Sequence, residues 1–117
     1  MNAQLFVKSL YESVDNKDLN VLSEKLDDAV YFKFSNSQAV TGKAAVLEAN
    51  NGFFSSIKSM CHEISNVWSQ GGDIICNGEV HYTRLDDSLC SAAFATILTV
   101  KNNKITNYLI YADVSLL

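Results

Sequence analysis

The chain has 117 residues, enough for one compact domain and too few for two of ordinary size, so we expect a single domain over residues 1–117. Hydrophobic residues make up 48% and charged residues 19%, proportions that exclude a disordered chain. The net charge of −4 argues against binding to nucleic acid. No apolar run approaches the roughly 20 residues of a membrane span and the first residues show no signal peptide, so we expect a cytoplasmic protein without membrane contact.

The first half of the chain has helical periodicity. Apolar residues at helical spacing predict helices over residues 3–15 and 18–26. A segment rich in β-forming residues predicts a strand over residues 29–34. A third helix is expected to begin at Thr41-Gly42 and to weaken at Asn50-Asn51-Gly52.

The second half, from about residue 60, consists of long strand-like segments separated by short turn signals. These signals are Gly71-Gly72, Asp86-Asp87 and Asn102-Asn103. Their spacing predicts an antiparallel meander of four strands. The predicted fold class is therefore α+β, with three N-terminal helices packed in the concave face of a strongly curved, mostly antiparallel sheet.

The turns also predict which side chains share a face of this sheet. If the turns at 86–87 and 102–103 are two-residue loops, His81 lies opposite Ala92, and Ala92 lies opposite Asp113. Continuing the count through the Gly-Gly turn places both histidines of the chain in one row with Asp113. Together with the helix region, this arrangement predicts an apolar pocket with a few polar groups. The predicted pocket residues are Asp113, His81, Glu79, Tyr111, His62, Trp68, Phe94, Leu109 and Phe54.

The opposite face of the predicted sheet carries small and apolar residues and almost no charge. Because the helices cover the pocket face, this second face would be exposed, which predicts a homodimer through the outer sheet face. The three cysteines, Cys61, Cys76 and Cys90, are widely spaced and are interpreted as reduced and mostly buried. A metal site of His62, His81 and Asp113 is the weaker alternative, so we expect no metal and no other cofactor.

Four segments carry a resemblance to a known family. In this order and at these separations, DNKDLNVLSEKLDDAVYF, VTGKAAVLEANNGFF, GEVHYTRLDDS and NKITNYLIYADVSLL resemble the SnoaL-like branch of the nuclear transport factor two-like (cystatin-like α+β cone) superfamily. The resemblance covers almost the whole chain. It implies a cone-shaped α+β domain around a pocket, a fold that hosts enzymes as well as proteins that only bind.

The resemblance also implies site residues. In the polyketide cyclases and epoxide hydrolases of this fold, an Asp on the last strand acts as acid or base, and Asp113 of YADVS stands at that position. Where the epoxide hydrolases carry an Arg-x-Asp pair, this chain has Glu79 and His81, which argues against that hydrolysis. The ketosteroid isomerase base falls near Lys33, and its partner acid falls near Ala95 or Thr96, so activity of that type is not expected.

Two functions stay open on the sequence. The first is a cofactor-independent acid/base enzyme of the cyclase, dehydratase or isomerase kind, in which Asp113, assisted by His81, moves a proton on a small hydrophobic carbonyl compound. The second is a non-catalytic module that binds such a ligand or serves as a dimeric accessory protein. A raised pKa of Asp113 would favour the first, because burial in an apolar pocket disfavours the ionised carboxylate.

Overall fold

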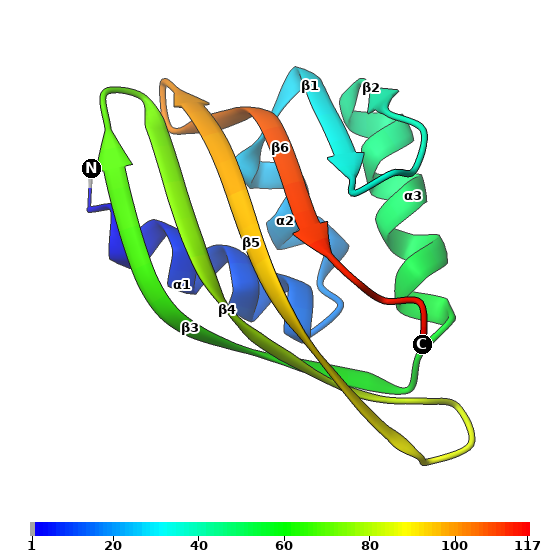
Figure 1. Cartoon of the computed structure of the whole chain (residues 1–117). Helices are drawn as coiled ribbons and strands as arrows, with labels where there is room; N and C mark the ends of the chain where they lie inside the picture. Colours follow the sequence, from blue (N-terminus) through cyan, green and yellow to red (C-terminus); the bar gives the residue numbers. More distant parts are fainter. Residues whose placement is uncertain (1) are drawn as a thin grey trace.

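Three helices pack against the concave side of one curved sheet (Figure 1). The structure is a computed structural model that describes residues 2–117. The elements along the chain are α1 (Ala3–Asp15), α2 (Leu19–Lys25), β1 (Leu26–Phe34), β2 (Val40–Thr41), α3 (Lys43–Ser55), β3 (Ser59–Gln70), β4 (Asp73–Thr83), β5 (Leu89–Lys101) and β6 (Lys104–Ala112). The predicted α+β class and the predicted order of elements are confirmed.

The helices begin where the sequence indicates. Helix α2 begins at Asp18, whose carboxylate accepts a hydrogen bond from the Val21 backbone N–H, as expected of an N-cap. Helix α3 begins at Gly42, which adopts a φ of 96°. The expectation that this helix weakens at Asn50 is wrong. Asn50 is buried and its side-chain amide donates to the Val46 carbonyl, so the helix continues.

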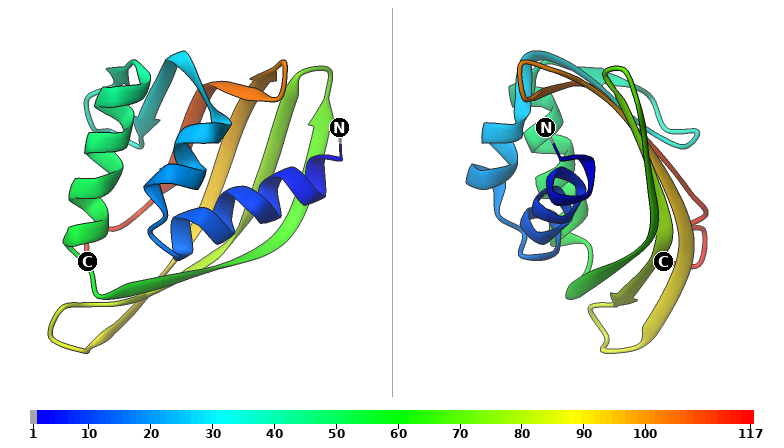
Figure 2. Two further views of the ribbon diagram at one scale, coloured as in Figure 1. Left: turned by 180° about the vertical axis from the view of Figure 1, so that it is seen from behind. Right: turned by 90° about the vertical axis from the view of Figure 1, so that its left-hand side faces the viewer.

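The sheet has the strand order β2-β1-β6-β5-β4-β3, so β2 and β3 are its edges and the sheet is open. The predicted antiparallel meander is present as β3 to β6. Strand β1 pairs with β6 in parallel, and β2 adds a short antiparallel edge. The edge view in Figure 2 shows the sheet curling around the helices, which creates a concave inner face and a convex outer face.

Two of the three predicted turns have the predicted length. The turns at 71–72 and 102–103 each join directly paired residues, Gln70 with Asp73 and Lys101 with Lys104. The two-residue loop at Asp86-Asp87 is wrong. Thr83 pairs with Leu89, so that loop spans residues 84–88.

Two β-bulges shift the register further. One lies in β3 between Ile64 and Asn66. The other lies in β6 between the residues that pair with Val100 and Thr99 of β5. The predicted opposition of His81 and Ala92 is also wrong, because the longer loop at 84–88 pairs His81 with Ser91. Since neighbouring residues of a strand point to opposite faces, a shift of one residue changes which side chains share a face.

The hydrophobic core lies between the helices and the inner face of the sheet. Its largest fully buried side chains include Tyr108, Leu10, Leu22, Leu26 and Ile57. Every helix in the described part of the chain is too short or too polar to cross a membrane.

Candidate functional site

A cavity of about 310 Å³ lies between the inner face of the sheet and helices α1 and α3. Most of its wall is aromatic or aliphatic, and it includes Phe32, Phe34 and Phe53. A few polar groups interrupt this wall. They are Tyr11, Ser37, Gln38, Asn50, His62, Tyr82 and Tyr108. An apolar cavity with a few polar groups is the usual form of a small-molecule site.

One polar contact in this wall joins an Asp to a His. Asp15, the last residue of α1, accepts a hydrogen bond from the backbone N–H of His62 at 2.9 Å and lies 2.5 Å from its Nδ1. The His62 side chain is only 9% exposed and that of Asp15 is 21% exposed. Two contacts to one carboxylate fix both the position and the rotation of the imidazole.

The bulge in β3 directs His62 into the cavity. After the bulge along the chain, Asn66 and Trp68 lie on the outer face, in register with Asn77 and Ile75. The extra residue, Ser65, reverses the alternation, so His62 pairs with the buried Val80 and faces inward. Without that residue, His62 would share the outer face with Trp68.

Two aromatic rings pack against the imidazole of His62. The ring centroid of His62 lies 4.3 Å from that of Tyr11 and 5.1 Å from that of Phe94. Because a carboxylate only accepts hydrogen bonds, Nδ1 carries a proton when it bonds to Asp15. In the neutral imidazole, Nε2 is then the acceptor and is available to a ligand.

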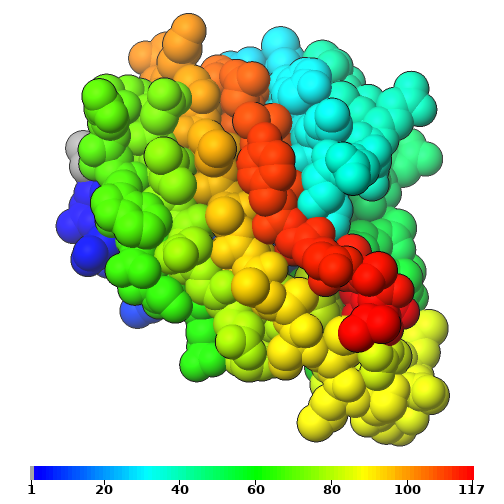
Figure 3. Space-filling view, in the orientation of Figure 1, coloured from blue at the N-terminus to red at the C-terminus, as the bar shows by residue number. Residues whose placement is uncertain are grey.

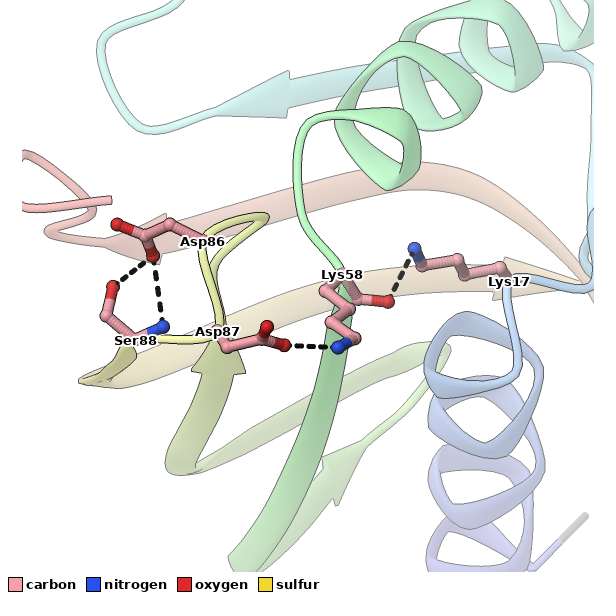
Figure 4. Close-up of polar contacts among 5 residues, drawn as sticks. All are labelled: Lys17, Lys58, Asp86, Asp87 and Ser88. Carbon is pink, nitrogen blue, oxygen red and sulfur yellow. Dashed lines mark hydrogen bonds and ion pairs between the residues drawn. The ribbon is translucent and has the colours of Figure 1, made fainter.

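A lysine ties the end of α1 to the strand that carries His62. The Lys17 ammonium donates to the Ile57 carbonyl at 2.8 Å and to the Lys58 carbonyl at 3.0 Å, and Figure 4 shows the second of these bonds. Figure 4 also shows the Lys58 ammonium paired with Asp87 of the β4–β5 loop. These contacts hold the turn after Asp15 against the start of β3, and so they support the contact between Asp15 and His62.

Buried tyrosines supply neutral hydroxyl groups. The Tyr11 hydroxyl lies 2.5 Å from Thr96 Oγ1 in the core. Burial raises the pKa of Tyr11 and Tyr108 well above the usual value, and it raises the pKa of Tyr82 to about 12. All three phenols therefore keep their protons at neutral pH and can donate hydrogen bonds.

No charged side chain lines the cavity, within the described residues 2–117. Asp15 contacts the wall through His62, and besides burial its charge also helps to raise the pKa of the lining phenols Tyr82 and Tyr108. In the same part of the chain, no group of three or more His, Cys, Asp or Glu side chains is placed to hold a metal ion.

The structure brings only part of the predicted set to the cavity. His62, Phe94 and Phe54 line it. The other predicted residues lie away from its wall. These are Asp113, His81, Glu79, Tyr111, Trp68 and Leu109. The corrected register accounts for this, because His81 and Glu79 share a strand face with Ser91 and Ala93 on the outside of the sheet.

The two residues first expected to act chemically have other surroundings. Asp113 is exposed and accepts a hydrogen bond from the Ser115 backbone N–H at 3.0 Å, which lowers its pKa. The raised pKa that would have favoured catalysis by Asp113 is therefore not found. His81 contacts Glu63 at 2.7 Å and Ser91 at 2.8 Å on the outer face.

Sequence reasoning missed Asp15 and the tyrosines of the cavity wall. Tyr11 and Asp15 are four residues apart on α1, a spacing that places them on one helical face and could have been noticed. The pairing of Asp15 with His62 across 47 residues depends on the bulge, whose signal in the sequence is the glycine at position 78 inside a strand.

Solved structures of three proteins are similar to the structure of this chain. A structure of an NTF2-like protein of unknown function from Burkholderia pseudomallei has a TM-score of 0.88 and 15% identity, and covers 99% of this chain and 94% of that chain. A protein from Jannaschia sp. CCS1, described as a SnoaL-like polyketide cyclase, has a TM-score of 0.85 and 14% identity, with 97% and 87% covered. An LEH-like epoxide hydrolase of M. tuberculosis has a TM-score of 0.83 and 13% identity, with 97% and 84% covered.

At these identities the solved structures show a shared fold. A search of curated protein sequences gave no match. The profile of the SnoaL-like domain matches residues 7–108, which is most of the chain. The predicted resemblance is thereby confirmed, and the chain belongs to the SnoaL-like domain family within the NTF2-like fold.

Proposed function

We propose that this protein binds a small hydrophobic molecule in its cavity and uses the pair Asp15–His62 to move a proton on it. The reaction class is cofactor-independent acid/base chemistry of the cyclase, dehydratase or isomerase kind. The observation that carries the proposal is the orientation of His62, whose Nδ1 is held by Asp15 while its ring forms part of an apolar cavity wall. Asp15 and His62 take the role first expected of Asp113 and His81.

The proposed step is proton abstraction from a carbon next to a carbonyl group. Nε2 of His62 accepts the proton, and the negative charge moves onto the carbonyl oxygen as the enolate forms. Asp15 stabilises the resulting imidazolium, and the neutral hydroxyls of Tyr82 and Tyr108 are the donors available to the oxygen. Return of the proton to another carbon of a conjugated enolate completes an isomerisation. Attack of the enolate carbon on a second carbonyl carbon, whose oxygen takes the proton, completes a ring closure. Departure of a β-hydroxyl group, which takes the proton and leaves as water, completes a dehydration.

The second candidate function is ligand binding without catalysis. The mostly apolar wall favours it, because such a surface binds a hydrophobic compound whether or not a proton moves. Structures with this fold include the LEH-like epoxide hydrolase and a protein named TerC that was crystallised with polyporic acid. The fold is therefore compatible with both functions, and an experiment on the pair itself must separate them.

An assay that follows exchange of the hydrogens next to a ketone group for deuterium distinguishes catalysis from binding alone. It does not require the natural substrate. The protein is incubated with 2-tetralone in D₂O, and loss of the α-proton signals is followed by NMR. We expect exchange faster than in buffer, with His62→Gln lowering the catalysed rate about 10²–10⁴-fold and Asp15→Asn lowering it about 10-fold or more. The control is His81→Gln, because the other histidine of the chain faces outward.

Binding is measured on the same variants by calorimetry. If wild type and both site variants bind 2-tetralone but none exchanges it faster than buffer, the acid/base function is wrong and the binding module stands. If His81→Gln loses exchange while His62→Gln keeps it, the assignment of the pair is wrong.

Two further expectations belong to the same proposal. We propose a second copy of this chain as the partner, covering the outer face of the sheet, where Trp68, Ile75 and Tyr111 are exposed. A cytoplasmic location is supported by the three cysteines, which form no disulfide among the described residues.

A further inference from the structure

We propose that the cavity selects uncharged compounds of two fused rings that carry one hydroxyl or carbonyl group. This proposal rests on the proposed function only in that the ligand occupies the same cavity. It concerns recognition, and it holds whether or not Asp15 and His62 move a proton.

The size of the cavity sets the number of rings. An apolar cavity of about 150 Å³ in a protein core accommodates one benzene molecule. The cavity here, at about 310 Å³, has room for about two such rings. It also lies at the lower end of the range of ordinary ligand pockets, about 300–1,000 Å³. A compound of four fused rings would therefore extend out of it.

The aromatic side chains favour a flat ligand. On one side, the rings of Tyr11, His62 and Phe94 lie with centroids 4.3 to 5.5 Å apart. A second group joins Phe53 to Phe34 at 6.1 Å and to Tyr82 at 5.9 Å. Both groups line the cavity, so a planar ligand meets ring faces and edges.

The absence of charge in the wall excludes acids. A carboxylate or phosphate would leave water and find no Lys or Arg among the residues that line the cavity in the described chain. The carboxylate of Asp15, which contacts His62, has the same sign as an acid. Bases are not favoured either, because both contacts of the Asp15 carboxylate go to His62.

Three of the polar residues in the wall can together match one hydroxyl or carbonyl group of a ligand. Asn50 uses its side-chain N–H on the Val46 carbonyl, which leaves its oxygen as an acceptor. His62 offers Nε2, and Tyr82 offers a protonated hydroxyl. These three groups line the same cavity, so they provide both donors and acceptors for an uncharged polar group.

The test is calorimetric titration of the full chain with four probes. 2-Naphthol is the expected ligand, phenol is too small, pyren-1-ol is too large, and 2-naphthoate adds a negative charge to the same ring system. We expect 2-naphthol to bind at least 10-fold more tightly than each of the others. Equal or tighter binding of any other probe, or no binding of 2-naphthol at millimolar concentration, overturns the proposal.

A pair of substitutions tests whether the ligand binds inside the cavity. Ala112→Leu extends a side chain of the cavity wall into it and should weaken binding of 2-naphthol at least 10-fold, whereas Ala45→Leu on the exposed side of α3 should not. If Ala112→Leu binds like wild type while folding normally, the ligand lies elsewhere and the proposal fails. The order of the probes is measured by calorimetry on the wild-type chain and the acid/base step by exchange of 2-tetralone, so failure of the acid/base step and failure of this selectivity are distinguishable.

Discussion

At the scale of single residues, burial controls the ionisation of the tyrosine side chains that line the site. Tyr82 is 4% exposed and Tyr108 is 1% exposed, and burial raises the pKa of each phenol above the value of about 10 found in unfolded chains. The folded state thus holds these protons more tightly than the unfolded state does. The same burial that keeps the phenols neutral for a ligand makes folding sensitive to high pH.

The prediction concerns stability in alkali. Because both pKa values are raised on folding, their contribution is fully present below pH about 10 and is lost as the pH rises toward 12. Urea unfolding between pH 8 and 11.5 should show the free energy of unfolding falling above pH 10, by up to about 1.4 kcal/mol per pH unit for each phenol. Tyr82→Phe should flatten this decline. The half-exposed Tyr111→Phe is the control, and an equal effect of the two substitutions would contradict the explanation.

The residue types in the sequence predicted the chemistry of the site, a histidine with a carboxylate. They did not predict which carboxylate meets which histidine. His62 was expected in the pocket from the count through the Gly-Gly turn, and it lines the cavity. That count placed it in a row with His81 and Asp113, whereas its partner is Asp15. A sequence shows that a histidine and a carboxylate are available, but which pair meets depends on the backbone between them.

At the scale of elements, a single glycine makes the bulge in β3 possible. A side chain at Gly78 would overlap the carbonyl oxygen of Glu63, so only glycine allows the two strands to approach here. The bulge in turn directs His62 inward. Gly78→Ala should therefore lower the free energy of unfolding by about 2–4 kcal/mol, because the obstacle is backbone that cannot move aside easily.

The matched control is Gly52→Ala in α3. An added Cβ at Gly52 meets nothing within 4 Å, so this substitution should be neutral or stabilise by up to about 1 kcal/mol through helix propensity. Urea unfolding of both variants gives the comparison, and the exchange assay shows whether any folded Gly78→Ala protein keeps His62 in place. Equal stability of the two variants would mean that the bulge does not depend on Gly78.

The elements show what the sequence could predict and where prediction stopped. Helix starts, the four strands of the meander and the turns at 71–72 and 102–103 follow from local signals and are confirmed. The strand expected over 29–34 begins earlier, at Leu26, and the short strand β2 was not expected. The loop over 84–88 and the two bulges are set by contacts between distant segments. Each moves the register by one residue, so a nearly complete list of strands still assigned Glu79, His81 and Tyr111 to the wrong face.

At the scale of the whole molecule, the outer face of the sheet has the character of an interface. Figure 3 views this face, on which β1 and β3 to β6 lie side by side. An apolar row crosses four strands in register. It consists of Trp68, Ile75, Ile97 and Leu109. Lys33 lies beside Leu109 at one end of the row, and Glu79 lies toward the opposite edge. Apolar rows with charges at their borders are typical of surfaces that a partner covers.

A second copy of the chain has complementary charges. In the proposed dimer, a two-fold axis that lies between two facing sheets and runs diagonally past Ile75 would bring Lys33 of each copy against Glu79 of the other. We therefore expect a dimer in light-scattering measurements coupled to size-exclusion chromatography. Ile75→Glu should give monomers, while Leu5→Glu, on an exposed part of α1, should not. Lys33→Glu and Glu79→Lys should each weaken the dimer, and the two together should restore it, because the exchanged charges again attract. A monomeric wild type would refute the dimer, and a double variant as weak as the single variants would refute this orientation of the two copies.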